Sequence, residues 1–219
     1  MARVMGWMCV GLLTTLVAAM ACLFVPEIFY AVYGNSAAPI VIIVAQLAAV
    51  LVLSVAINRL SPAAATVIFM VYSALTGLTI STVVLIYDLS SIILAFGVSA
   101  FLFLAMSLYG LVTKKDLSSW GRLLFFGLLG IVAASLLNMF LGNAMLDLAV
   151  TCVGIVIFVA LTAYDTQKIK GIYMTAAVGG YDDESPELRR LAIFGALTLY
   201  LDFINLFLKL LRLMGRRRR

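Results

Sequence analysis

Long apolar runs separated by short polar stretches make up most of this chain. Runs long enough to cross a bilayer, roughly 17–25 residues each, occupy residues 6–25, 39–57, 63–86, 92–112, 122–141, 145–165 and 191–213. The connections between them are short, except for the polar stretch 166–190. Because no room remains for a separate soluble domain, the pattern predicts a single all-α transmembrane domain over residues 1–219, a compact bundle of seven helices.

The composition agrees with this pattern. Of the 219 residues, 65% are hydrophobic and 11% are charged, and the mean hydropathy is +1.18. A soluble domain has about a quarter of its residues charged. The first run follows Arg3 and is longer than the roughly 7–15 apolar residues of a secretory signal. We therefore expect it to stay in the protein as a helix.

Basic residues alternate with acidic ones from one connection to the next. The basic residues lie before the first run and in or beside the second, fourth and sixth connections: Arg3, Arg59, Lys114, Lys115, Arg122, Lys168, Lys170, Arg189 and Arg190. The other connections carry Glu27, Asp88 and Asp147. Because basic loops remain in the cytoplasm, this pattern predicts a cytoplasmic N-terminus. The last run either crosses, leaving the tail Gly215–Arg219 outside, or re-enters; its length favours crossing.

The last run also carries a polar stripe. Thr198, Asp202, Asn205 and Lys209 recur at helical spacing, with Leu, Phe and Ile on the remaining faces. A charge near the centre of a span costs about 2.5–3.5 kcal/mol on insertion scales, so we expect Asp202 to face the bundle interior and to be functional. For Thr198 and Asn205, a hydrogen-bonded seam between helices is favoured over a pore lining.

A second aspartate, Asp165, ends the sixth run. A solvated charge paired with Lys168 at i, i+3 explains it equally well. Arg59 ends the second run on the same side, either as a topology anchor or as a partner of the acids. A cluster of Asp165, Asp202 and Arg59 is therefore feasible. Two carboxylates held close in a low dielectric titrate as a pair, which predicts a pH switch.

Several kinds of chemistry are excluded by composition. The chain has no histidine, which removes Ser-His-Asp and Cys-His nucleophiles, HExxH zinc sites and histidine pH sensors. Cys9, Cys22 and Cys152 lie within apolar runs and have neither disulfide nor metal-ligand spacing. We expect no cofactor, and metal ligands cannot be assigned. Any titrating switch must be built from carboxylates.

Four segments resemble the Bax inhibitor-1 family (transmembrane BAX inhibitor motif proteins), in its bacterial inner-membrane branch. They are GIVIFVALTAYDTQKIK (Gly154–Lys170), GALTLYLDFINLFLKLLR (Gly195–Arg212), YSALTGLTIS (Tyr72–Ser81) and MSLYGLVTKKDLS (Met106–Ser118). The resemblance implies a seven-helix fold in which two groups of three helices wrap a central C-terminal helix. It also implies a multi-pass protein of the bacterial inner membrane.

The same resemblance implies a function, a pH-sensitive calcium leak governed by an aspartate pair and an arginine latch. By motif the aspartates correspond to Asp165 and Asp202, and the arginine corresponds to Arg59 in the less distinctive SVAINRLS (Ser54–Ser61). Some members carry an acidic residue within the second helix, where this chain offers Gln46 as a polar residue for a pore or seam. Calcium would be the transported ion.

Two other functions fit parts of the sequence. Intramembrane aspartyl proteases also pair two aspartates, and Tyr164–Asp165 fits one half of their motif, but Leu199–Leu201 before Asp202 does not fit the other. We therefore do not expect an enzyme. A non-conducting regulator that binds a membrane protease or other membrane proteins is the main alternative. Anionic lipids suit the basic tail and the net charge of +5, whereas no nucleic-acid motif is present.

Overall fold

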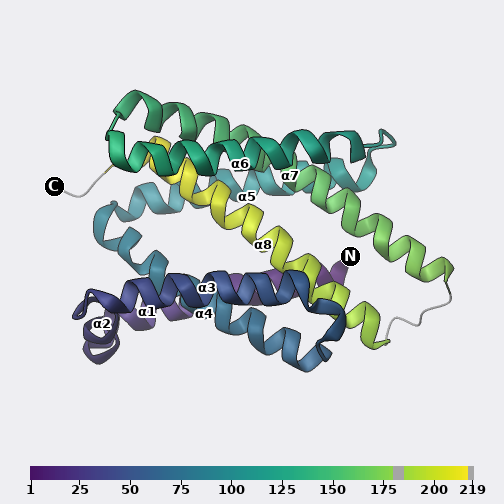
Figure 1. Ribbon diagram of the computed structural model, residues 1–219, viewed down its shortest axis with the longest axis horizontal. Coiled ribbons are helices and arrows are strands. Elements are labelled where there is room, and N and C mark those ends of the chain that lie inside the picture. Colours follow the sequence, from purple (N-terminus) through teal and green to yellow (C-terminus); the bar gives the residue numbers. More distant parts are fainter. Residues whose placement is uncertain (180–184, 217–219) are drawn as a thin grey trace. The chain divides into compact units, whose positions relative to one another are not determined.

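The computed structural model describes residues 1–179 and 185–216, and within these ranges the chain is helical with no strand (Figure 1). The elements are α1 (Ala2–Phe24), α2 (Pro26–Tyr33), α3 (Ala37–Val55), the 3-10 turn η1 (Ile57–Arg59), α4 (Pro62–Ile86), α5 (Leu89–Val112), α6 (Ser118–Leu141), α7 (Ala144–Val178) and α8 (Pro186–Met214).

Every described α-helix except α2 is long and apolar enough to cross a membrane, which gives seven candidate spans. The most apolar windows of these helices have mean hydropathies of 1.9 to 2.6. The predicted all-α, multi-span fold is thereby confirmed. Proline and glycine mark several helix ends: Pro26 and Pro62 open α2 and α4, where a backbone N–H is dispensable, and Gly142 closes α6 with a φ of 61°.

Two parts of the helix pattern differ from the sequence prediction. α7 continues beyond Asp165 through much of the expected connection 166–190, so that Asp165 lies well inside a helix. The continuation is polar, but its side chains have partners; the Lys170 ammonium donates to the Leu111 carbonyl at 2.7 Å. The expected connection 26–38 contains α2, whose Tyr33 hydroxyl donates to the Leu78 carbonyl at 2.8 Å. Apolar length alone finds the spans but not such extensions.

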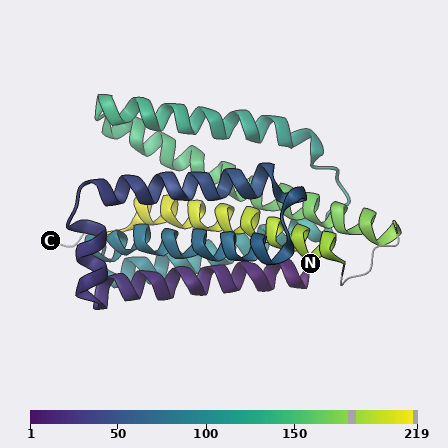
Figure 2. The ribbon, with the colours of Figure 1, turned by 60° about the horizontal axis from the view of Figure 1, so that its bottom comes forward.

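The chain divides into two compact units. The first comprises Met1–Ile86 and Tyr173–Tyr200, and therefore holds α1 to α4, the end of α7 and the first half of α8. Here α1 and α4 lie side by side, as Figure 2 shows. Gly77 permits this approach, because a Cβ atom there would lie 2.3 Å from the Thr15 carbonyl oxygen. α3 packs on the same helix, α4.

The second unit comprises Tyr87–Ile172 and the chain from Leu201 onward, and so contains α5, α6, most of α7 and the second half of α8. Its core is built on Phe158 of α7 with Leu206 and Leu210 of α8. Gly110 on α5 brings that helix against α7, since a Cβ atom there would lie 2.3 Å from the Ala163 carbonyl oxygen.

α8 is the most enclosed of the described spans. In its apolar window 67% of the residues are buried, compared with 11–33% in the other six. Its first half packs within one unit and its second half within the other. Asp202, which this helix carries, is accordingly placed inside protein and away from lipid.

Candidate functional site

Two aspartates from different helices meet in the second unit. Asp202 on α8 is only 5% exposed, and its carboxyl group lies within hydrogen-bonding reach of that of Asp165 on α7. Ionised carboxylates only accept hydrogen bonds, so a hydrogen bond between the two requires a proton on one of them. Asp202 Oδ2 finds no donor among the described groups, which leaves this atom free to bond to a proton carried by the pair.

Asp165 is less enclosed than Asp202 and has a basic neighbour. Lys168, one turn along α7, acts on Asp165 electrostatically, but the two do not form an ion pair in the described structure. The exposed Lys168 ammonium lies instead 5.8 Å from the centre of the Tyr164 ring. Asp165 therefore faces two environments, the buried Asp202 on one side and a basic, exposed surface on the other.

Polar side chains next to Asp165 fasten α7 to α5 and to the connection between α5 and α6. The Thr166 hydroxyl donates to Ser107 Oγ at 3.2 Å, and Gln167 accepts from the Leu117 N–H at 2.9 Å. Gln167 also donates to the Lys115 carbonyl at 2.9 Å. These contacts fix the height and rotation of α7 beside the aspartate pair. They were not predicted, although the run of polar residues directly after Asp165 is a visible signal.

The other polar residues singled out from the sequence lie in separate places. Thr198 and Asn205 each donate to a carbonyl four residues earlier on α8, those of Phe194 and Leu201, at 3.0 and 2.8 Å. These donated bonds stay within one helix. Gln46 on α3 instead bridges to α4 in the first unit, donating to Thr76 Oγ1 at 3.2 Å.

Arg59 belongs to the first unit, whereas both aspartates belong to the second. It ends η1, and its side chain is exposed. An exposed arginine at a helix end satisfies the anchor interpretation without further contacts. The latch remains a prediction for experiment.

A second charged group of residues lies further along the same pair of helices. Arg212 on α8 forms an ion pair with Asp147 on α7. One turn earlier on α8, half-buried Lys209 is within electrostatic range of both. Gly154 makes room for it, because a Cβ atom there would lie 3.0 Å from Lys209 Cε. The Thr151 hydroxyl oxygen is buried nearby on α7 without a hydrogen-bond partner among the described groups.

Apolar side chains of α7 and α8 also pack together in this unit. Phe158 of α7 lies between Thr151 and Asp165 in the sequence, and it packs with Leu206 and Leu210 of α8. Along α8, the apolar Leu206 of this cluster lies between Asp202 and Lys209, and Leu210 directly follows Lys209. The sequence stripe on α8 indicated Asp202 and Lys209, but not the apolar cluster that Phe158 forms with Leu206 and Leu210.

The described residues offer no ready-made metal centre. No group of three or more His, Cys, Asp or Glu side chains gathers among them. The aspartate pair supplies two carboxyl groups, which suits a transient cation or a proton better than a resident metal ion.

The whole chain, residues 1–219, matches the sequence model of the family described as "Inhibitor of apoptosis-promoting Bax1". The chain belongs to this family. A relative in Escherichia coli (strain K12), the "Inner membrane protein YbhL", is 50% identical over 218 residues, which cover 100% of this chain and 92% of the relative. The resemblance inferred from the four sequence segments is thereby confirmed.

Less similar relatives match the chain with the same or lower coverage. An uncharacterized protein of Borreliella burgdorferi is 42% identical over 218 residues, covering 100% of this chain and 92% of the relative. An uncharacterized membrane protein of Streptococcus pyogenes serotype M1 is 42% identical over 171 residues, covering 78% and 71%. The chain is thus a multi-span membrane protein of the Bax1 inhibitor family.

Proposed function

We propose that this protein is a pH-sensitive cation leak of the bacterial inner membrane, with calcium as the transported ion and Asp165 and Asp202 as the pH-sensing gate. The observation that carries this proposal is the meeting of two carboxyl groups on neighbouring helices, one of them almost fully buried. Buried acids are costly to place in a membrane, and those that occur there mark ion or proton pathways.

The pair acts on the helices through its proton. With one proton shared, the carboxyl groups form a hydrogen bond that joins α7 to α8. When this proton is lost, two negative charges face each other in a low dielectric and repel, unless a cation or Arg59 compensates. Because the two groups interact directly, they titrate as one unit, and neither has an independent protonation state.

Separation of the aspartates would also loosen the apolar cluster of the same two helices. Phe158 of α7 and Leu206 of α8, which pack in one buried cluster, would keep water from passing between the aspartate pair and the Lys209 region while α7 and α8 are packed together. A cation needs either water or oxygen ligands along its path, so this cluster would block conduction in the packed state. Movement of α7 against α8 would let water in and connect the two polar groups.

The test is calcium flux into liposomes that contain only the purified protein. We expect wild type to conduct and its flux to change across pH 6 to 8. Asp165→Asn and Asp202→Asn keep the size and polarity of each side chain but remove one titrating group, so each variant should lose the pH dependence and keep its fold. Asp116→Asn, at an exposed position on the connection before α6, is the matched control and should retain the wild-type profile.

The outcomes separate the leak from its main alternative. If wild type carries no calcium at any pH, a non-conducting regulator that binds a membrane protease or another membrane protein becomes the better account. If wild type conducts but both Asn variants keep its pH profile, the leak stands and the aspartate pair is not its sensor.

A further inference from the structure

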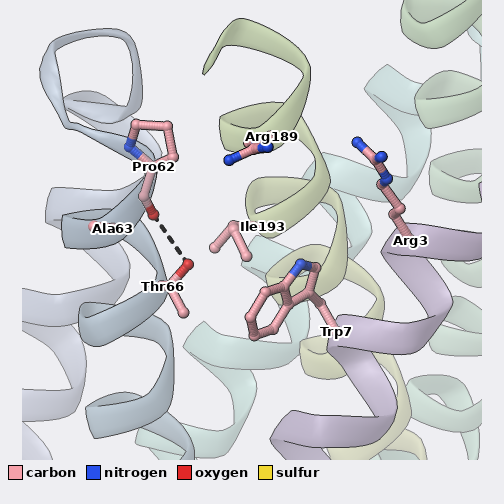
Figure 3. A pocket seen from close by; sticks show the side chains of 7 residues that line it. All are labelled: Arg3, Trp7, Pro62, Ala63, Thr66, Arg189 and Ile193. Atoms are coloured by element: carbon pink, nitrogen blue, oxygen red, sulfur yellow. Dashed lines mark hydrogen bonds between the residues drawn. The ribbon is translucent and has the colours of Figure 1, made fainter. Parts of the chain in front are cut away.

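Three helices of the first unit begin around one pocket. α1, α4 and α8 each contribute residues from their first two turns, and the pocket has a volume of about 450 Å³. The described residues that line it are Arg3, Trp7, Pro62, Ala63, Thr66, Arg189 and Ile193 (Figure 3). Nothing in the proposed leak uses these residues.

The polar groups of the pocket are suited to an anion. Figure 3 shows Arg3 and Arg189 at the same end of the pocket, on different helices, with the indole nitrogen of Trp7 on the side of its ring nearer to them. The Thr66 hydroxyl already donates to the Pro62 carbonyl at 3.0 Å. None of the described lining residues is acidic. The donors thus come from two guanidinium groups and an indole.

The backbone adds to this positive character. The N-terminal ends of α1, α4 and α8 all lie at the pocket, and each helix N-terminus carries a partial positive charge. The arrangement is held by Arg190, which donates from α8 to the Leu60 carbonyl just before α4 at 3.2 Å. Two arginines combined with three helix N-termini favour a compact anion such as a phosphate group.

The rest of the lining is apolar. Ile193 is only 2% exposed, and the faces of Trp7 and Pro62 form further wall. Tryptophan and arginine at the ends of membrane spans are typical of the headgroup region of a bilayer. A free phosphate ion would not use the apolar wall, whereas the glycerol and upper acyl part of a lipid would.

We propose that this pocket binds the phosphate of an anionic phospholipid headgroup, with Arg3 and Arg189 holding the phosphate and Trp7 packing against the glycerol. Both arginines also interact with other groups of the protein. A guanidinium has five N–H donors, so it can hold a phosphate while keeping another partner.

Trp7 gives a direct reading of binding. The chain has two tryptophans, and Trp120→Phe, on α6 in the second unit, leaves Trp7 as the sole indole. The full-length protein in a neutral detergent is titrated with short-chain phosphatidylglycerol, with short-chain phosphatidylcholine and with inorganic phosphate, while Trp7 fluorescence is followed. We expect phosphatidylglycerol to bind in preference to phosphatidylcholine, and inorganic phosphate to bind more weakly than phosphatidylglycerol.

Variants then locate the site. Arg3→Gln and Arg189→Gln should each weaken phosphatidylglycerol binding roughly fivefold, the effect expected for one basic residue near an anionic headgroup. Arg122→Gln, which removes the same charge from an exposed position on α6 outside the pocket, should leave the affinity unchanged. The double variant of Arg3 and Arg189 should bind more weakly than either single variant; if it fails to fold, the two single variants carry the comparison.

Three results would overturn the proposal. Equal affinity for phosphatidylglycerol and phosphatidylcholine would show that the pocket does not select an anionic headgroup, since both lipids carry a phosphate but only one is a net anion. An equal loss in Arg122→Gln would show that net charge, and not the pocket, attracts the lipid. Inorganic phosphate binding as tightly as phosphatidylglycerol would make the site one for a soluble anion.

Discussion

Asp202 places an ionisable carboxyl group within a helix that is otherwise apolar enough to cross a membrane. Its carboxyl group is buried, and within the described structure its Oδ2 atom has no hydrogen-bond donor. An unpaired polar atom of this kind is expensive inside a protein unless a proton, a water molecule or an ion completes it. Asp165 supplies the nearby group with which a proton can be shared. The need of this buried carboxyl group for a proton or another bonding partner is thus the basis of its proposed sensitivity to pH.

Substitution of Arg59 tests whether its guanidinium acts as a latch on the aspartate pair. If its guanidinium compensates the aspartates in a closed state, Arg59→Ala should change the calcium flux at neutral pH, because the carboxylates lose their counter-charge. Arg59→Lys should also change it, since lysine keeps the charge but loses the planar pair of donors. Flux is measured across pH 6 to 8 at matched protein density. Equal flux from wild type and both variants would leave Arg59 as a topology anchor.

The contact between the helices α1 and α4 depends on close approach of their backbones. A substitution at the glycine that permits this approach tests it. Gly77→Ala would place a Cβ atom 2.3 Å from the Thr15 carbonyl oxygen and 2.7 Å from Ala18 Cβ. Because a backbone oxygen cannot move aside alone, α1 and α4 must separate. We expect a loss of about 1–3 kcal/mol in stability, seen as a lower midpoint of thermal unfolding in detergent.

Gly97→Ala is the matched control for this substitution. Gly97 also lies within a membrane-spanning helix, α5, but a Cβ atom there meets nothing within 4 Å. Alanine favours the helix over glycine by about 1 kcal/mol, so this variant should unfold at the same temperature or higher. A Gly77→Ala protein as stable as Gly97→Ala would contradict the close packing of α1 against α4.

At the scale of the whole molecule, the end of α8 bears on the topology of the chain. The Arg216 carbonyl accepts from the Asp88 N–H at 3.1 Å, just before α5, and Arg212 pairs with Asp147 near the start of α7. α8 therefore ends beside the two acidic connections of the second unit. If those connections face outward, as the distribution of basic residues predicts, the last helix crosses the membrane and its tail lies outside.

Labelling of single cysteines tests this topology. In a background where Cys9, Cys22 and Cys152 are replaced by alanine, a membrane-impermeant maleimide applied to spheroplasts should modify Asn143→Cys and Met214→Cys. It should modify Lys115→Cys only after the membrane is permeabilised. Labelling of Asn143→Cys from outside with protection of Met214→Cys would show that the last helix does not cross.

The membrane spans and the family could both be predicted from the sequence, because both depend on local features. A span is recognised by its apolar length, and the family by short sequence motifs. It did not predict the extension of α7, since the partners of its polar residues, such as the Leu111 carbonyl bonded by Lys170, come from a distant part of the chain. Asp202 and Lys209 were identified from their spacing. The apolar cluster of Phe158, Leu206 and Leu210 was not, because these residues look like any other membrane residues until their packing is known.

Tyr200 and Asp202 lie two residues apart on α8, yet their partners belong to different units. The Tyr200 hydroxyl lies 2.6 Å from Thr15 Oγ1 in the first unit, and Asp202 meets Asp165 in the second. Two residues along a helix correspond to about 200° of rotation and about 3 Å of rise, so the two side chains point in nearly opposite directions. Because only Leu201 separates them, a change in the rotation of α8 at Asp202 would also change the position of the Tyr200 hydroxyl. The rotation of α8 therefore affects both contacts, the one at the Tyr200 hydroxyl and the one at the Asp202 carboxyl group.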